Sequence, residues 1–184
     1  MSIITDDIIS AEMLVHVPMC THKDPKKVLV LAKNKEIEAQ LQKYQNLTCT
    51  FVFKDFLKEV ETLEEASYDV VIADIEENIN VLFIAQLNRV LAKDGLFVCT
   101  SEDKKALMLD CGNLFGIVMP YRYTKTKTFD EVVLSSKRYH PTADIILQRS
   151  DLLEDLKYYN TEIHLASFAL PSFERKNLAG IYKQ

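Results

Sequence analysis

The sequence predicts one α/β domain whose mostly parallel β-sheet carries an antiparallel hairpin at one edge. Short, almost wholly apolar runs, such as residues 27–32 and 68–74, are typical of strands that a parallel sheet buries on both faces. Segments with apolar residues at helical spacing separate these runs along the chain. This alternation of strand and helix indicates a parallel sheet with helices on both faces.

The first half of the chain supplies the parallel part of the predicted sheet. Strands are expected at residues 27–32, 48–53, 68–74 and 96–100. Helices are expected at residues 34–44, 56–66 and 82–91. Lys93-Asp94-Gly95 closes the last of these helices, because glycine and basic residues are common at helix ends.

The second half of the chain predicts the edge of the sheet. After a helix at residues 103–111, two extended segments at 114–123 and 128–135 are expected to pair as an antiparallel hairpin. This combination is a Rossmann-like fold of the methyltransferase type. Near the end of the chain, Asn160 is a good N-cap for a short helix that must stop before Pro171.

The composition narrows the class of protein. A chain of 184 residues is long enough for one domain with a real core. Its net charge of −5 argues against nucleic acid as a partner, because binding to phosphates needs a basic face. The sequence has no long apolar run and no basic-then-apolar leader, which argues against a membrane. Four scattered cysteines without a Cys-x-x-Cys pair favour a cytoplasmic protein, and four histidines without ligand spacing argue against a metal site.

The most specific string of the sequence is Tyr158-Tyr159-Asn160-Thr161-Glu162-Ile163-His164, with its continuation to Pro171. It resembles the C-terminal signature of spermidine synthases, the polyamine aminopropyltransferases. Residues 12–18, 68–74 and 94–99 resemble other segments of that family, in the expected order. The chain is thus identified as a truncated and divergent member, with a single spermidine synthase-like domain over residues 1–184. By this resemblance, the family's N-terminal β domain is expected to be missing, and residues 1–24 are expected to be the remnant of a linker.

The sequence departs from the family between its first strand and Asp74. The family's glycine-rich cofactor loop is replaced by Ala32-Lys33-Asn34-Lys35-Glu36. One strand–helix unit is also expected to be deleted there, and two assignments stay open. In the first, residues 48–53 lead to an adenine-contacting Asp55 and the ribose-binding strand is lost. In the second, residues 48–53 are the ribose-binding strand without its acid.

The resemblance implies an activity, the transfer of an aminopropyl group from decarboxylated S-adenosylmethionine to putrescine in polyamine biosynthesis. Decarboxylated S-adenosylmethionine is then a co-substrate, and no resident cofactor is expected. By position, Asp74 corresponds to the catalytic base, Glu77 to a second acid that binds substrate, and Asp55 to the adenine contact. Tyr121 and Tyr123 fall where the family presents a substrate-contacting tyrosine.

The residues alone also allow plainer roles. Asp55 can be the N-cap of the helix that starts at Phe56, Asp74 can cap a loop, and the two tyrosines can be packing residues. The alternative function is accordingly a catalytically inactive homologue that serves as a binding or oligomerisation domain. In either case a homodimer is expected.

Overall fold

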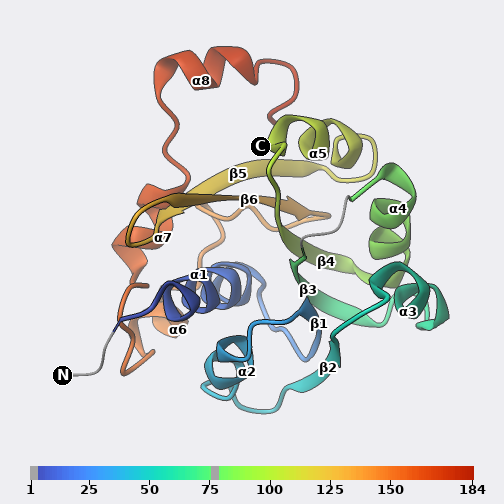
Figure 1. The fold of residues 1–184 in the computed structure, drawn as a ribbon, viewed down its shortest axis with the longest axis horizontal. Helices are drawn as coiled ribbons and strands as arrows, with labels where there is room; N and C mark the ends of the chain where they lie inside the picture. The colour runs from blue at the N-terminus through green and yellow to red at the C-terminus, as the bar shows by residue number, and fades with distance from the viewer. Residues whose placement is uncertain (1–3, 76–78) are drawn as a thin grey trace.

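The computed structural model describes residues 4–75 and 79–184, and it contains a six-stranded sheet of order β2-β1-β3-β4-β6-β5 (Figure 1). The strands are β1 (Lys27–Ala32), β2 (Thr48–Val52), β3 (Tyr68–Asp74), β4 (Leu91–Thr100), β5 (Ile117–Thr124) and β6 (Phe129–Ser136). The first four strands are parallel, whereas β6 runs antiparallel to both β4 and β5. The predicted fold class, a mostly parallel sheet with an antiparallel edge hairpin, is confirmed.

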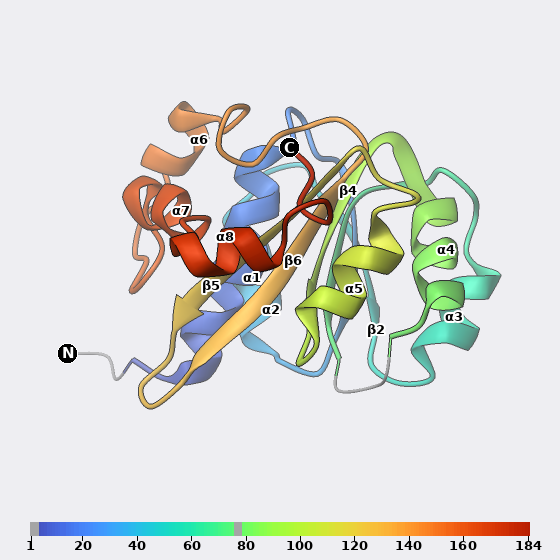
Figure 2. The same ribbon diagram turned by 90° about the horizontal axis from the view of Figure 1, so that it is seen from above.

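Helices cover both faces of this sheet (Figure 2). They are α1 (Asp6–Thr21), α2 (Glu36–Leu41), α3 (Phe56–Thr62), α4 (Val81–Val90), α5 (Lys104–Cys111), α6 (Leu147–Asp151), α7 (Thr161–Ser167) and α8 (Ser172–Asn177). Side chains of α1 and α2 and of the C-terminal segment form one core with alternate strand residues, such as Val30 and Ile72. Side chains of α3, α4 and α5 form a second core with the strand residues that point the other way, such as Leu31 and Val71. The sheet therefore separates two apolar layers, as its two-sided burial predicted.

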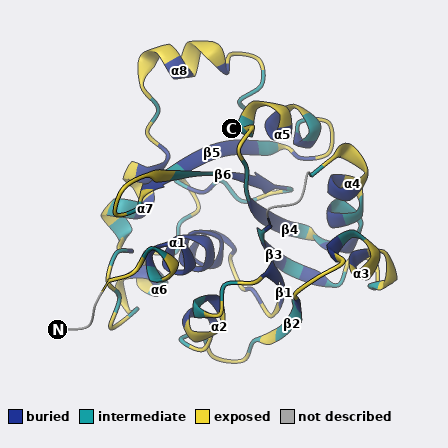
Figure 3. Ribbon diagram, in the orientation of Figure 1, coloured by how far each residue is buried: buried dark blue, intermediate teal, exposed yellow. Residues whose placement is uncertain are grey.

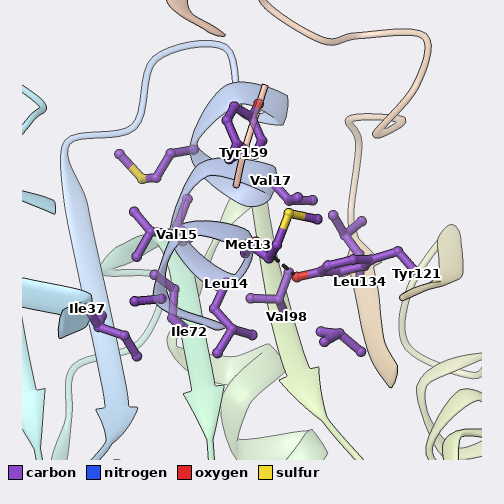
Figure 4. Close-up of a cluster of buried hydrophobic side chains, with 14 of the residues drawn as sticks. Met13, Leu14, Val15, Val17, Ile37, Ile72, Val98, Tyr121, Leu134 and Tyr159 are labelled. Atoms are coloured by element: carbon purple, nitrogen blue, oxygen red, sulfur yellow. Dashed lines mark hydrogen bonds between the residues drawn. The ribbon is translucent and has the colours of Figure 1, made fainter. Parts of the chain in front are cut away.

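The N-terminal segment corrects the expectation of a linker at residues 1–24. Its residues Asp6–Thr21 form a 16-residue helix in which every residue from Ile9 onward is buried (Figures 3 and 4). Thr5 caps its start by accepting the backbone N–H of Ile8 at 3.3 Å. The helix contacts β3 and β4 of the sheet as well as α2 and α6. Most side chains of this helix are apolar, and such a helix is stable when it is buried.

Two element boundaries differ from the prediction around residues 91–95. These residues were expected to close a helix, but they belong to β4, where Leu91 pairs with Tyr68 before a bulge. The chain bends so tightly here that a Cβ atom on Gly95 would lie 2.9 Å from Cδ2 of Leu91. Glycine is needed at this position because the bend leaves no room for a side chain.

The C-terminal signature begins as predicted. The Asn160 side chain accepts the backbone N–H of Ile163 at 2.8 Å, which is the expected N-cap of α7. The helix ends at Ser167, and Pro171 directly precedes α8. None of the helices in the described residues is long and apolar enough to cross a membrane.

Candidate active site

Asp74 is the last residue of β3, at the edge of the sheet where the parallel strands end. Open α/β sheets bind their ligands at this edge, because the loops leaving the strands diverge there. The Asp74 side chain is half-buried, and its Oδ1 accepts a hydrogen bond from Oγ1 of Thr100 at 3.2 Å. Thr100 ends the neighbouring strand β4, so two adjacent strand ends fix the position of the carboxylate.

A cleft of about 840 Å³ opens beside Asp74. Its lining residues are Asp74, Ile75, Ile79, Thr100, Ser101, Glu102, Asp103, Ala106, Leu107, Phe129, Asp130 and Glu131. They come from the ends of β3 and β4, the start of α5 and the start of β6. Five of them carry carboxylates and five are apolar, whereas no lysine or arginine of the described residues lines the cleft. This mixture suits a positively charged ligand with an aliphatic body.

Two of the five carboxylates are paired with cations. Asp130 lies 2.5 Å from Nζ of Lys125, and Glu131 forms an ion pair with Lys104. The carboxylates of Asp74, Glu102 and Asp103 have no ion-pair partner within residues 4–75 and 79–184, although Asp103 accepts the backbone N–H of Ala106 as the N-cap of α5. The cleft therefore keeps an excess of negative charge.

Burial raises the pKa of the Asp74 carboxyl above its usual value. The hydrogen bond from Thr100 and the charge of Lys125 act in the opposite direction, and the negative charges of Asp130 and Asp7 add to the rise. A carboxylate with a raised pKa holds a proton better and is therefore a stronger general base toward an amine.

Of the other predicted site residues, the structure buries both tyrosines away from the cleft. Tyr121 is 1% exposed and donates its hydroxyl to the carbonyl oxygen of Met13 at 3.4 Å (Figure 4). Tyr123 is 2% exposed and donates its hydroxyl to Oδ2 of Asp130 at 3.0 Å. Neither lines the cleft, although Tyr123 supports an acid that does.

The predictions for Asp55 and Glu77 fare differently. Asp55 follows β2 with a φ of 50°, and its side chain makes no cap hydrogen bond, so its interpretation as a side-chain N-cap is wrong. It does not line the cleft beside Asp74. Glu77 lies outside the described residues.

The loop after β1, where the family has its glycines, is held by Asn34. The Asn34 side chain donates to the carbonyl oxygen of Asp7 at 3.0 Å and accepts the backbone N–H of Glu36 at 3.0 Å. The side chains of Lys33 and Lys35 are exposed. None of these residues lines the cleft, which lies on the β4 and β6 side of Asp74.

The sequence prediction missed Thr100, Asp103, Asp130 and Glu131 as residues of the site. Asp130 and Glu131 lie near the start of β6, and an antiparallel strand starts at the edge where its parallel neighbours end. The predicted hairpin therefore already contained the signal that would have placed these acids near Asp74.

Comparisons with known proteins agree with this architecture, although no protein-family model matches the chain. The polyamine aminopropyltransferase of Helicobacter acinonychis is 28% identical over 96% of the chain and 77% of that protein. Spermidine synthase 2 of Arabidopsis thaliana is 26% identical over 93% of the chain and 67% of its own length. The crystal structure of spermidine synthase from Thermotoga maritima superposes with a TM-score of 0.81 at 24% identity, covering 94% of the chain and 74% of that structure.

The sheet order and the acidic cleft at its carboxyl edge define an α/β protein of the Rossmann-like, spermidine synthase type. The sequence relatives, named polyamine aminopropyltransferase and spermidine synthase and 26–28% identical to the chain, support membership of the spermidine synthase family.

The same comparison bears on the expected deletion of a strand–helix unit. The alignment with the Helicobacter acinonychis protein extends over 211 positions, more than the 184 residues of the whole chain. The relative therefore has residues inside the aligned region to which nothing in this chain corresponds. In the structure, β2 is the single strand beyond β1 and pairs with it directly, which is the arrangement expected if a unit is lost on this side.

Proposed function

We propose that this chain binds putrescine in the acidic cleft and transfers to it an aminopropyl group from decarboxylated S-adenosylmethionine, with Asp74 as the general base. The observation that carries the proposal is the half-buried Asp74 carboxylate at the end of β3, next to an open cleft with unpaired acids. The names of the sequence relatives, polyamine aminopropyltransferase and spermidine synthase, support the same reaction class.

The reaction requires a neutral amine as the nucleophile. Putrescine carries two ammonium groups at neutral pH, so one must lose its proton before its lone pair attacks the carbon bonded to the sulfonium. Asp74 takes that proton, the new N–C bond forms, and the C–S bond breaks with its electron pair left on sulfur. The products are spermidine and neutral methylthioadenosine, so that charge and atoms balance.

The remaining carboxylates of the site bind the other end of the diamine. Glu102 and Asp103 line the cleft without ion-pair partners in the described residues, and they hold the ammonium group that does not react. Glu77, three positions after Asp74, is assigned to the same task by its place in the sequence. Tyr123 acts through Asp130, to which its hydroxyl is bonded, and Tyr121 is assigned to the core.

A second candidate function is diamine binding without transfer. It is favoured by the loop after β1, where two lysines and the bonded Asn34 stand in place of glycines. Side chains at these positions take up space that a glycine loop leaves to a nucleoside, and the lysines repel a sulfonium cation. Asp55 is assigned as the adenine contact only in the catalytic candidate.

Calorimetry with two ligands separates the candidates. Putrescine and methylthioadenosine are titrated separately into the wild-type chain, into Asp74→Asn, and into the matched control Asp110→Asn, whose side chain makes no hydrogen bond or ion pair with the described residues. Binding of both ligands by the wild type and by Asp110→Asn, with turnover lost only in Asp74→Asn, supports aminopropyl transfer. Binding of putrescine alone, with no turnover, supports the second candidate. Failure to bind either ligand at millimolar concentration contradicts both.

A further inference from the structure

The C-terminal signature is fastened to the N-terminal helix by one buried carboxylate. Glu12, which is 1% exposed, accepts three backbone N–H groups at 2.8 Å each, from Lys157, Tyr158 and Tyr159. A carboxylate is costly to bury unless several donors satisfy it, and three aligned N–H groups do so. Residues 157–159 are consequently held in one position on α1.

From this position, Tyr158 reaches the edge strand of the sheet. Its hydroxyl oxygen accepts the backbone N–H of Thr124, the last residue of β5, at 2.9 Å. Because β5 lies at the edge of the sheet, this N–H points away from β6 and has no partner strand. The Tyr158 hydroxyl therefore takes the place of the carbonyl acceptor that a neighbouring strand would provide. It does so where β5 ends and the turn of the hairpin begins.

The turn of the hairpin has a second attachment, to the first turn of α1. The Asp6 carboxylate accepts the backbone N–H of Thr126 at 2.8 Å and its hydroxyl at 2.6 Å. The tip of the β5–β6 hairpin, residues 124–130, thus lies beside the start of α1 and the C-terminal segment (Figures 1 and 2). The tip is therefore hydrogen-bonded both to the start of α1 and to Tyr158.

This hairpin tip carries charges that act on the cleft. Lys125 and Asp130 form an ion pair across the turn, and Asp130 lines the cleft. Both charges influence the Asp74 carboxyl, Lys125 by lowering its pKa and Asp130 by raising it. A displacement of the tip would change both effects together.

We propose that Tyr158 is a positioning residue for the site, which acts through Thr124 to hold Asp130, with its ion-pair partner Lys125, at the cleft that Asp74 also lines. The C-terminal signature then contributes to the chemistry without touching a substrate, because it places the charges that the amine meets. The effect on putrescine rests on the proposed function, whereas the effect on the hairpin and on Asp74 does not.

The test compares Tyr158→Phe with Tyr139→Phe. Both changes remove one hydroxyl and keep the ring, but the Tyr139 hydroxyl makes no hydrogen bond with the described residues and its ring packs on His22. In Tyr158→Phe, amide hydrogen exchange at Thr124 and Lys125 is expected to speed up about three- to tenfold, as loss of one hydrogen bond implies. Tyr139→Phe leaves this exchange unchanged.

The decisive readout is the titration of the Asp74 carboxyl, followed by its ¹³C chemical shift. The groups that act on Asp74 are Thr100, Lys125, Asp130 and Asp7. Of the two on the hairpin tip, Lys125 has the larger effect, so loosening the tip is expected to raise the pKa of Asp74 and to weaken putrescine binding severalfold. An unchanged Asp74 titration in a folded Tyr158→Phe protein overturns the proposal, whatever happens to the exchange rates.

A second variant removes the same hydrogen bond from the donor side. Thr124→Pro deletes the N–H that Tyr158 accepts, and proline is tolerated on an edge strand where the N–H faces away from the sheet. It is expected to raise the pKa of Asp74 as Tyr158→Phe does, and it decides the matter if Tyr158→Phe does not fold. If the wild type fails to bind putrescine, the proposed function is lost, but the exchange and titration still decide the role of Tyr158.

Discussion

The two sides of Asp74 differ in what they preserve. On the side of β4 and β6, unpaired carboxylates and apolar side chains surround an open cleft. On the side of β1 and β2, exposed lysines and the hydrogen-bonded Asn34 occupy the loop where the family resemblance predicts glycines. The side proposed to bind an amine therefore keeps unpaired acids, whereas the side expected to bind a nucleoside carries lysines. The difference shows that similarity to an enzyme family has to be tested as function for each side of the site separately.

The largest expected effect comes from the residue between the two halves. We expect Asp74→Asn to lower the rate of aminopropyl transfer about 100- to 10,000-fold, because an amide cannot accept the proton of the attacking amine. The rate is measured with decarboxylated S-adenosylmethionine and putrescine, with Asp110→Asn as the control. A variant that keeps more than about a tenth of the wild-type rate would show that the base lies elsewhere.

The next effect concerns the stability of the fold, through two buried histidines. His16 donates to or accepts from Gln40 and Tyr44, and His164 does so with Tyr159 and the carbonyl of Pro141. Burial lowers the pKa of His16 to about 3 and that of His164 to about 4, from 6.5. Both histidines are neutral in the folded protein, whereas the unfolded chain takes up protons below pH 6.5. The stability they provide is complete above that pH and is lost as the pH falls toward 4 and 3.

The size of this acid effect is bounded by proton linkage. Each histidine lowers the free energy of unfolding by up to about 1.4 kcal/mol per pH unit within that window. Urea denaturation at pH 7 and pH 5 measures the loss, and His16→Gln is expected to reduce the dependence. Equal stability of the wild type at both pH values would contradict the neutral, buried state of the two rings.

A smaller effect is expected from substitutions in the loop after β1, on the side proposed for the nucleoside. Replacing Lys33, Asn34 and Lys35 by glycine removes the side chains of this loop. The space they leave is what should favour methylthioadenosine, since this ligand is neutral. We expect the affinity for methylthioadenosine to rise at least fivefold, about 1 kcal/mol, while the affinity for putrescine stays the same. Calorimetry measures both. A rise in putrescine affinity instead would mean that the loop belongs to the amine half.

The smallest expected effect comes from the hydrogen bond that Thr100 donates to Asp74. Thr100→Val keeps the shape of the side chain and removes the donor, so the charged form of Asp74 loses one source of stabilisation. The pKa of Asp74 should rise further, and the acid limb of the pH–rate profile should move to higher pH. The free energy of unfolding should change by less than about 1.5 kcal/mol. A shift to lower pH would contradict the hydrogen bond.

The sequence allowed the sheet to be predicted because its strands are apolar on both faces. Residues 27–32 and 68–74 were placed correctly for this reason. Helix α1 could not be recognised by the same means, since apolar residues surround it and no amphipathic pattern marks it as a helix. The elements that cover α1, including α2, α6 and the C-terminal segment, come together only in the folded chain.

The position of Asp74 in the candidate site could be expected from a single strand, whereas the positions of other cleft residues depend on strand pairing. Asp74 followed from its place at the end of a buried strand. Tyr121 and Tyr123 were expected at the substrate, but alternation along β5 points both toward α1 and buries them. Asp130 and Glu131 reach the cleft through the antiparallel register of β6 with β4. The hairpin was predicted, but its pairing partner was not, so its acids were not assigned to the edge where Asp74 lies.

The attachment of Glu12 to residues 157–159 also sets the order in which this domain can be completed. The bonded residues are 145 to 147 positions apart, so almost the entire chain must leave the ribosome before the contact can form. Until then, the mostly apolar helix α1 is not covered by the C-terminal segment. Such long-range closure slows folding and exposes apolar surface during synthesis. Helix α1 and residues 157–159 are therefore expected to depend on each other during biosynthesis as much as in the finished fold.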